Sequence, residues 1–117
     1  MEDVKRDVLE LFKQLGKEWM VLLFLHITSE GPITYNELNR LLNKSISPSL
    51  LSMRLKKMQD MKLIERRKLD GRIKYYPTKT GIQLKAKLMG IKDWAVENGY
   101  SLPEECSHPN MKCDAFD

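Results

Sequence analysis

The sequence predicts a mainly α-helical domain that carries one small β-hairpin, and three local patterns predict this class. Thr34 and Glu37 have the spacing of a capping box, which opens a helix. Ser47-Pro48 supplies an N-cap followed by a proline that suits the first helical position. Asp70-Gly71 lies between two short strand-like segments and is a typical two-residue hairpin turn. In chain order these patterns predict a helix, a tight turn, a second helix and a hairpin.

Two further helices are expected before this region. The first is expected over residues 3–15, where apolar residues recur at helical spacing. The second is expected over residues 17–29 and is apolar on nearly all sides, which is typical of a helix covered by the rest of the fold. Gly31-Pro32 ends this helix, and Ile33 is expected to form a short third strand against the hairpin.

The remaining elements follow from similar signals. The helix that starts at the proline is expected to span residues 48–61, and the hairpin strands are expected at residues 63–69 and 72–76. A long last helix is expected from the N-cap Thr78 to the C-cap signal Asn98-Gly99.

Length and charge limit the number of domains and the kinds of partner that this chain can have. A chain of 117 residues fits one domain, which we expect over residues 1–99, with residues 100–117 as an irregular tail. The net charge of +4 and the isoelectric point near 9.1 favour polyanionic partners. No apolar run is long enough to span a bilayer, and the charged N-terminus has no signal-peptide pattern. We therefore expect a cytoplasmic protein without a membrane partner.

The helix over residues 48–61 has two chemically different faces. At about 100° per residue, five apolar residues form its core side: Leu50, Leu51, Leu55, Met58 and Met61. Four residues form the opposite side: Ser49, Ser52, Met53 and Lys56. Serines let a helix approach DNA closely, a methionine can touch thymine methyl groups, and a lysine can reach guanine or phosphate. With the N-cap Ser47, these four residues are candidate DNA contacts. The alternative is a face that is simply solvated.

Two other polar residues in the helices are expected to serve the fold. Arg54 projects toward the apolar edge of its helix, so we expect it to pair with a carboxylate or a helix end, with DNA contact as the alternative. His26 lies on the apolar second helix and is expected to be a core or interface residue and not a metal ligand.

The hairpin carries a cluster of cations. Five of them are candidate DNA contacts: Arg66, Arg67, Lys68, Arg72 and Lys74. By strand alternation, Ile73 and Tyr75 share a face that is expected to pack inward, so that Arg72 and Lys74 point outward. The alternative is an edge strand that its cations keep soluble. A helix-turn-helix followed by a basic hairpin favours duplex DNA, with a helix in the major groove and a wing on the backbone or minor groove.

A longer run of residues matches a known family. The matching residues are Gly16-Lys17, Trp19, Gly31-Pro32, Tyr35-Asn36-Glu37-Leu38, Ile46-Ser47-Pro48, Leu51, Arg54-Leu55, Leu63-Ile64, Tyr75, Thr78 and Gly81. With this run the chain resembles the HxlR group of winged-helix transcription regulators, which are relatives of the MarR regulators. The resemblance implies a homodimer that represses or activates from an inverted-repeat operator, with the terminal helices forming the dimer interface. Met53 departs from the polar side chain that such proteins often have there, and the tail lies outside the pattern.

The sequence therefore predicts a homodimeric, sequence-specific regulator that binds double-stranded DNA. The alternative is a winged-helix protein-interaction module without specific DNA binding, although such a surface more often exposes aromatic residues than lysines. We find no glycine-rich phosphate loop and no plausible catalytic triad. No enzymatic activity and no cofactor are expected.

A small-molecule effector is a further candidate partner. Its expected site lies between the dimer helices, near the large aromatic residues Phe12, Trp19 and Trp94, which define a candidate effector pocket.

The tail holds both cysteines, Cys106 and Cys113, with His108 between them. Three interpretations remain open: free thiols, a disulfide within a chain or between protomers, and a zinc site with a fourth ligand such as Asp114. The spacing matches no common zinc finger, so no metal is expected.

Overall fold

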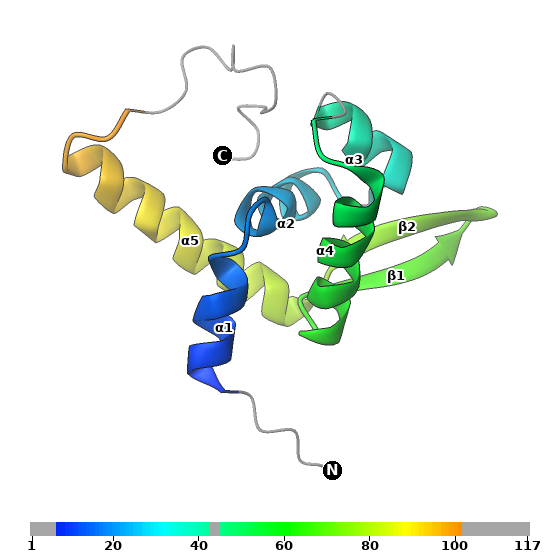
Figure 1. The fold of residues 1–117 in the computed structure, drawn as a ribbon, viewed down its shortest axis with the longest axis horizontal. Coiled ribbons are helices and arrows are strands. Elements are labelled where there is room, and N and C mark those ends of the chain that lie inside the picture. The colour runs from blue at the N-terminus through cyan, green and yellow to red at the C-terminus, as the bar shows by residue number, and fades with distance from the viewer. Residues whose placement is uncertain (1–6, 43–44, 102–117) are drawn as a thin grey trace.

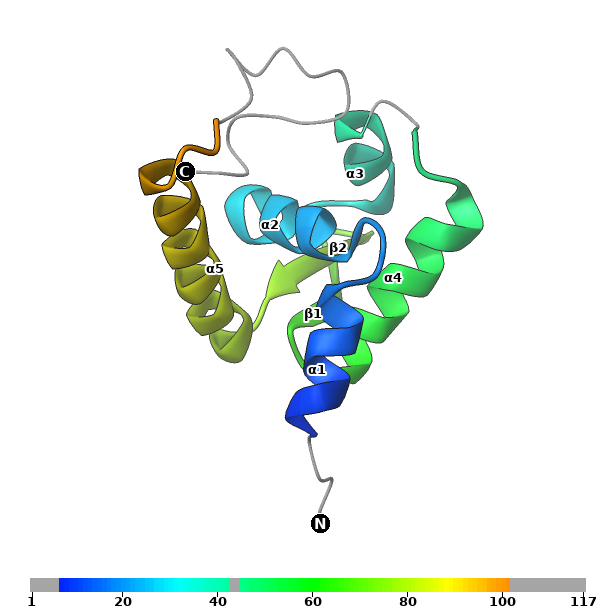
Figure 2. The same cartoon turned by 60° about the vertical axis from the view of Figure 1, so that its left-hand side comes forward.

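The computed structural model describes residues 7–42 and 45–101. Within these ranges the chain forms helices around one antiparallel hairpin, as the sequence predicts. The elements in chain order are α1 (Val8–Leu15), α2 (Met20–Glu30), α3 (Tyr35–Leu41), α4 (Pro48–Asp60), β1 (Ile64–Leu69), β2 (Arg72–Pro77) and α5 (Lys79–Glu97). Figure 1 shows α2 in the middle, α5 on one side of it, and the hairpin projecting from the other side. In the turned view of Figure 2, α3 and α4 lie across α2 from α5.

The apolar helix α2 lies at the centre of the core, as expected. Leu23 and Ile27 are fully buried, and Phe24 and Met20 are almost so. Buried residues between α2 and the end of β2 complete the core cluster: Ile33, Leu38, Leu42, Ile46, Leu51, Leu55, Met58, Leu63, Ile64 and Tyr75. Leu84 and Leu88 of α5 are partly buried against it. Burial of large apolar side chains like these is the main stabilising term of such a domain. His26 is also fully buried, which confirms that it is a core residue.

Side-chain caps start the three helices that follow α2. In the capping box, Thr34 Oγ1 accepts from the Glu37 N–H at 3.1 Å, and Glu37 Oε1 accepts from the Thr34 N–H at 2.9 Å. Ser47 Oγ accepts from the Leu50 N–H at 3.1 Å, and Thr78 Oγ1 accepts from the Gly81 N–H at 2.9 Å. Each cap satisfies a backbone donor that lacks a partner inside the helix.

The hairpin has the predicted turn. Asp70 and Gly71 both have positive φ angles, 54° and 77°, which is the geometry that two-residue hairpin loops favour. The strands pair from Ile64 opposite Pro77 to Leu69 opposite Arg72.

The expected third strand is present as an isolated antiparallel bridge. Ile33 pairs with Tyr75 of β2 through two backbone hydrogen bonds of 3.1 and 2.8 Å. The segment between α2 and α3 is thereby fixed to the base of the hairpin.

The start of α5 is held against the start of the hairpin. The Thr78 hydroxyl donates to the Lys62 carbonyl at 2.7 Å, and the Thr78 N–H donates to the Leu63 carbonyl at 3.1 Å. Gly81 passes so close to the Leu63 carbonyl that a Cβ at this position would collide with it. Only glycine allows this approach.

Two expectations need correction, and two others lie partly outside the described residues. Helix α2 begins at Met20, three residues later than expected, because Trp19 takes a left-handed conformation with φ 73°. Ile73 was expected to pack inward but is 38% exposed, because it lies near the hairpin tip, beyond the body of the domain. Residues 3–6 of the expected first helix, and residues 102–117 of the expected tail, lie outside the described residues. No helix among the described residues is long and apolar enough to cross a membrane.

Candidate nucleic-acid interface

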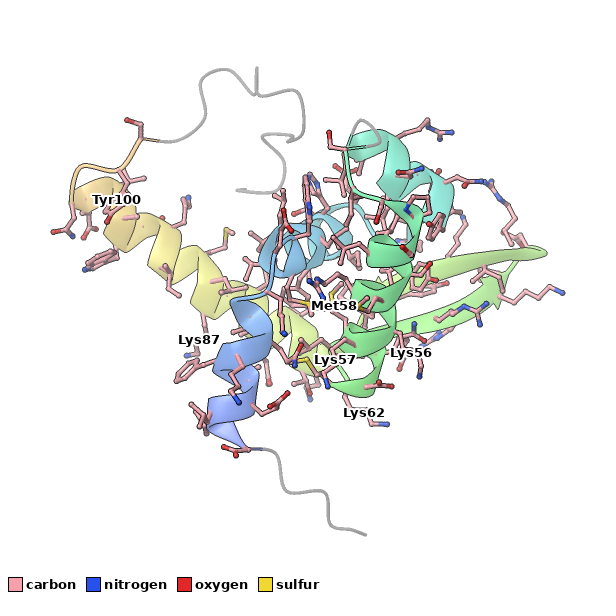
Figure 3. The ribbon with its side chains drawn as sticks, viewed as in Figure 1. Lys56, Lys57, Met58, Lys62, Lys87 and Tyr100 are labelled. Carbon is pink, nitrogen blue, oxygen red and sulfur yellow. The ribbon has the colours of Figure 1, made fainter. Side chains whose placement is uncertain are left out.

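Helix α4 presents the two faces that its sequence predicts. Leu51, Leu55 and Met58 are buried in the core, whereas Leu50 and Met61 are half-buried at its edge. The four residues of the opposite face are all exposed: Ser49, Ser52, Met53 and Lys56. Figure 3 shows Met58 directed into the molecule and Lys56 directed away from it. We call the exposed face of α4 the reading face.

The start of α4 is fixed by a contact that the sequence did not single out. The Tyr35 hydroxyl, at the first residue of α3, donates to the Pro48 carbonyl at 3.1 Å. This bond joins the first turns of the two helices of the helix-turn-helix. Ser47 Oγ accepts the capping bond of α4, so its hydroxyl proton remains available as a donor to a phosphate.

Lys56 on the reading face has an acidic neighbour one turn later. Its Nζ lies 3.4 Å from Asp60 Oδ1, and both side chains are largely exposed. Exposed pairs of this kind contribute little in water and are screened by salt. A phosphate can therefore displace Asp60 as the partner of Lys56 at small cost.

The cations of the hairpin lie on two faces, which the register defines. Residues directly opposite each other in an antiparallel pair have side chains on the same face. Arg66 pairs with Tyr75, and Lys68 with Ile73, so these two cations share one face. The other three, Arg67, Arg72 and Lys74, share the opposite face by the same register. The hairpin therefore carries positive charge on both sides.

Arg67 is the most engaged of these cations. Its Nε and Nη2 donate to Glu65 Oε1 at 2.9 and 2.6 Å. Its guanidinium also lies over the Tyr76 ring, 5.0 Å from the ring centre. Both partners keep the charge of Arg67 close to the hairpin surface, so Arg67 is less available to DNA than its neighbours.

The carboxylate of Glu37 connects the start of α3 with the charges of β2. Hydrogen bonding from the Thr34 N–H lowers the pKa of Glu37 below its ordinary value, although desolvation acts in the opposite direction. The Thr34 hydroxyl and the positive charges of Arg72 and Lys74 lower this pKa further. Glu37 is therefore ionised at neutral pH and lies within electrostatic reach of two cations of the hairpin.

Arg54 has the structural role that the sequence indicated. Its Nε donates to the Glu18 carbonyl at 2.8 Å, just before the start of α2. Its position is half-buried.

The three aromatic residues proposed for an effector pocket lie on different parts of the described chain. Phe12 is 64% exposed on α1, Trp94 is 57% exposed on α5, and Trp19 is half-buried against the core. A hollow of about 280 Å³ lies between α2 and α5, where apolar side chains such as Val21 and Leu88 line it. Another, of about 260 Å³, lies between the end of α2 and α3. None of the three aromatic residues borders either hollow.

The described residues also contain no cluster of histidine, cysteine and acidic residues that could hold a metal ion. Cys106, His108 and Cys113 lie outside the described residues.

This order of helices, with a projecting basic hairpin after an exposed helix face, defines a winged helix-turn-helix protein. The model of the HxlR-like helix-turn-helix family matches residues 14–102, and the chain belongs to this family of transcriptional regulators. No curated protein matches the chain.

Several solved structures share the fold. The reduced form of the transcriptional regulator YodB from B. subtilis is 26% identical, with a TM-score of 0.68 over 81% of this chain and 94% of that chain. A possible HxlR family transcriptional factor from Thermoplasma volcanium GSS1 is 24% identical, with a TM-score of 0.64 over 83% of this chain and 85% of that chain. The redox regulator HypR in its oxidised form is 22% identical, with a TM-score of 0.66 over 81% of this chain and 98% of that chain.

Proposed function

We propose that this HxlR-family protein is a homodimeric regulator that binds specific sequences of double-stranded DNA. The observation that carries the proposal is the reading face of α4, which is exposed beside a projecting hairpin with cations on both sides. The reading face enters the major groove, and the wing over residues 63–76 contacts the backbone or the minor groove.

The chemistry of the reading face predicts the kind of readout. Ser49 and Ser52 are small, so the helix axis can lie close to the base edges, where hydroxyl groups donate or accept hydrogen bonds. Met53 is 57% exposed and offers an apolar contact to thymine methyl groups. Lys56 reaches guanine or a phosphate. The first turn has no Arg, Asn or Gln on this face, so part of the specificity must come from the shape and deformability of the DNA.

The wing suits the minor groove because its charges are divided between two faces. A narrow groove has a phosphate backbone on each side, and a hairpin that enters it edge-on turns one face to each backbone. Arg66 and Lys68 then contact the phosphates of one DNA strand, and Arg72 and Lys74 contact those of the other. Figure 1 shows the hairpin extending clear of the helices, which gives it room to enter.

The terminal helices support a homodimer. None of the residues of helix α1 is buried within the described chain, and its apolar residues Val8, Leu9 and Phe12 are 62% to 64% exposed. Helix α5 exposes Ile91 at 60% and Trp94 at 57%. Apolar surface of this extent is typical of an interface between chains. We propose that α1 and α5 pack against the same helices of a second copy about a two-fold axis.

Selection of bound fragments from random duplex DNA tests the function. We expect enrichment of an inverted repeat, and a higher affinity for the enriched duplex than for a shuffled duplex of the same composition. Failure to enrich any sequence, together with binding that does not respond to salt, would instead support the protein-interaction module.

A thiol effector is a second proposal, which rests on the likeness to YodB. YodB structures are described in a reduced form and in a diamide-treated form, each 26% identical to this chain. Cys106 and Cys113 are the cysteines of this chain. We propose that their oxidation changes the affinity for DNA.

A further inference from the structure

The joint between α1 and α2 has an unusual backbone. Trp19 has φ 73°, a left-handed conformation that is unfavourable for a residue with a Cβ. It occupies the N-cap position of α2 without a side-chain capping bond. Its indole is half-buried and packs against the core cluster, which holds the residue in this conformation.

The left-handed turn sets the Glu18 carbonyl apart from the helix that follows. The backbone bond from the Leu23 N–H goes to the Trp19 carbonyl, so the hydrogen-bond ladder of α2 starts one residue after Glu18. The donor that reaches the Glu18 carbonyl is Arg54 Nε, at 2.8 Å. These two residues are 36 positions apart in the chain. Figure 2 shows the turn between α1 and α2 alongside α4.

Arg54 also touches the reading face directly. Its Nη1 lies 3.8 Å from the sulfur of Met53, the adjacent residue and a member of that face. One side chain therefore contacts the joint that orients α1 and a side chain that we propose to meet DNA. The guanidinium is planar with fixed donor directions, so it transmits orientation better than a flexible ammonium group does.

We infer that Arg54 is a positioning residue that couples the dimerisation arm α1 to the recognition helix α4, an inference that rests on the proposed function. A change in the angle of α1 alters the Glu18–Trp19 turn, and Arg54 carries this change to α4. By reciprocity, DNA binding to α4 affects the joint. Arg54 itself need not touch DNA.

Fluorescence of Trp19 gives a direct test. The chain has two tryptophans, so Trp94→Phe leaves Trp19 as the sole tryptophan and keeps an aromatic ring on α5. In this background, saturation with the selected duplex is expected to shift the Trp19 emission. Arg54→Met should remove the shift while the protein still folds and binds. The variant should also lower the ratio of the affinity for the selected duplex to the affinity for random duplex by about tenfold. This change is within the usual range of coupling between sites.

Three further variants separate the positioning role of Arg54 from its charge and from an effect on folding. Lys57→Met removes a cation from the same helix, and the Lys57 side chain makes no hydrogen bond or ion pair among the described residues. It should keep the Trp19 shift and the affinity ratio. Arg54→Lys keeps a donor within reach of the Glu18 carbonyl and should restore part of both. If the Arg54→Met variant unfolds, Arg54→Gln takes its place in the test. The glutamine donor is shorter, so we expect the same loss of the Trp19 shift and of the affinity ratio.

The outcomes distinguish this inference from the proposed function. A parent that binds the selected duplex without any change in Trp19 emission would overturn the coupling but leave the proposed function intact. The same holds if the Arg54 variants respond as the parent does. If the parent binds no DNA at all, the proposed function fails, and the inference fails with it.

Discussion

Ile33 and Tyr75 exchange a pair of backbone hydrogen bonds, and this pair joins the wing to the helix-turn-helix. The Ile33 N–H donates to the Tyr75 carbonyl at 3.1 Å, and the Tyr75 N–H donates back at 2.8 Å. The next residue, Thr34, caps α3. Because of this bridge, the wing and the helices that precede α4 are expected to meet DNA as one rigid unit.

The first prediction concerns the wing. If a dimer engages roughly six phosphates, the logarithm of affinity should fall with the logarithm of salt at a slope of about −5, or about a thousandfold between 50 and 200 mM. The double variant Lys68→Ala with Arg72→Ala should weaken binding to selected and random duplexes alike and flatten the slope. Lys17→Ala with Lys87→Ala removes the same charge from two exposed sites away from the wing. Equal slopes for the two double variants would contradict a backbone clamp.

The second prediction concerns the reading face. Ser52→Ala and Lys56→Ala should lower affinity for the selected duplex by about 1–3 kcal/mol in total and change random binding less, because base contacts carry the specificity. Gln83→Ala, at an exposed position on α5, serves as the control and should leave both affinities unchanged. Equilibrium titration with the selected and the random duplex measures the ratio of the two affinities. If this ratio is unchanged in the variants, the specificity does not come from Ser52 and Lys56.

The third prediction concerns assembly. Phe12→Glu should convert the dimer to a monomer at micromolar concentration, because it places a charge in the proposed interface. The protomer should stay folded, since Phe12 is 64% exposed within it. Lys13→Glu changes the charge of the same helix at an exposed position and should leave the dimer in place. Sedimentation velocity distinguishes these states, and a monomeric parent would refute the dimer.

The fourth prediction uses the lowered pKa of Glu37. Hydrogen bonding from Thr34, with the charges of Arg72 and Lys74, lowers the folded-state pKa of Glu37 below its ordinary value of 4.5. The resulting stability is therefore present above about pH 4.5 and is lost as the pH falls through the folded-state pKa. Glu37→Gln keeps an oxygen that accepts the Thr34 N–H but removes the charge. Urea titrations across this pH range should show a smaller decline for the variant.

The same variant should affect DNA binding in the opposite direction. Without the carboxylate, Arg72 and Lys74 lose a nearby negative charge, so affinity for random duplex should rise at neutral pH. Tighter binding combined with lower stability would separate the role of Glu37 as a counter-charge from its role as a cap. A fall in affinity would show that Glu37 does not act as a counter-charge to Arg72 and Lys74.

The fifth prediction concerns the cysteines. Cys106→Ser with Cys113→Ser should remain folded and bind DNA under reducing conditions, because residues 20–75 supply the buried core cluster of the described chain. Oxidant should change the affinity of the parent and not that of the double variant. Stoichiometric zinc in the purified parent, or sensitivity of the parent to a chelator, would favour the metal site instead.

Local chemistry explains why much of the fold could be predicted. The caps at Thr34, Ser47 and Thr78 and the turn at Asp70-Gly71 depend on neighbours within a few residues, so the sequence displays them directly. The two faces of α4 follow from helical periodicity alone.

Other features depend on contacts between distant segments. The left-handed Trp19 and the bond from Arg54 to Glu18 require α4 to be placed beside the first joint, which no local pattern reveals. The rotations of α1 and α5 decide whether Phe12 and Trp94 meet, and periodicity does not determine these rotations. The engagement of Arg67 could have been found, because strand alternation places Glu65 two residues away on the same face.

The close approach of Gly81 to the Leu63 carbonyl joins the start of α5 to the start of the hairpin. Together with Thr78, this contact attaches the wing to one end of a 19-residue helix whose other end carries Trp94. In the proposed dimer, the length and phase of α5 therefore set the distance between the two wings. One residue inserted after Gly81 would lengthen the helix by about 1.5 Å and rotate its distal surface by about 100°. Relatives with altered operator spacing should accordingly differ in this helix by whole turns.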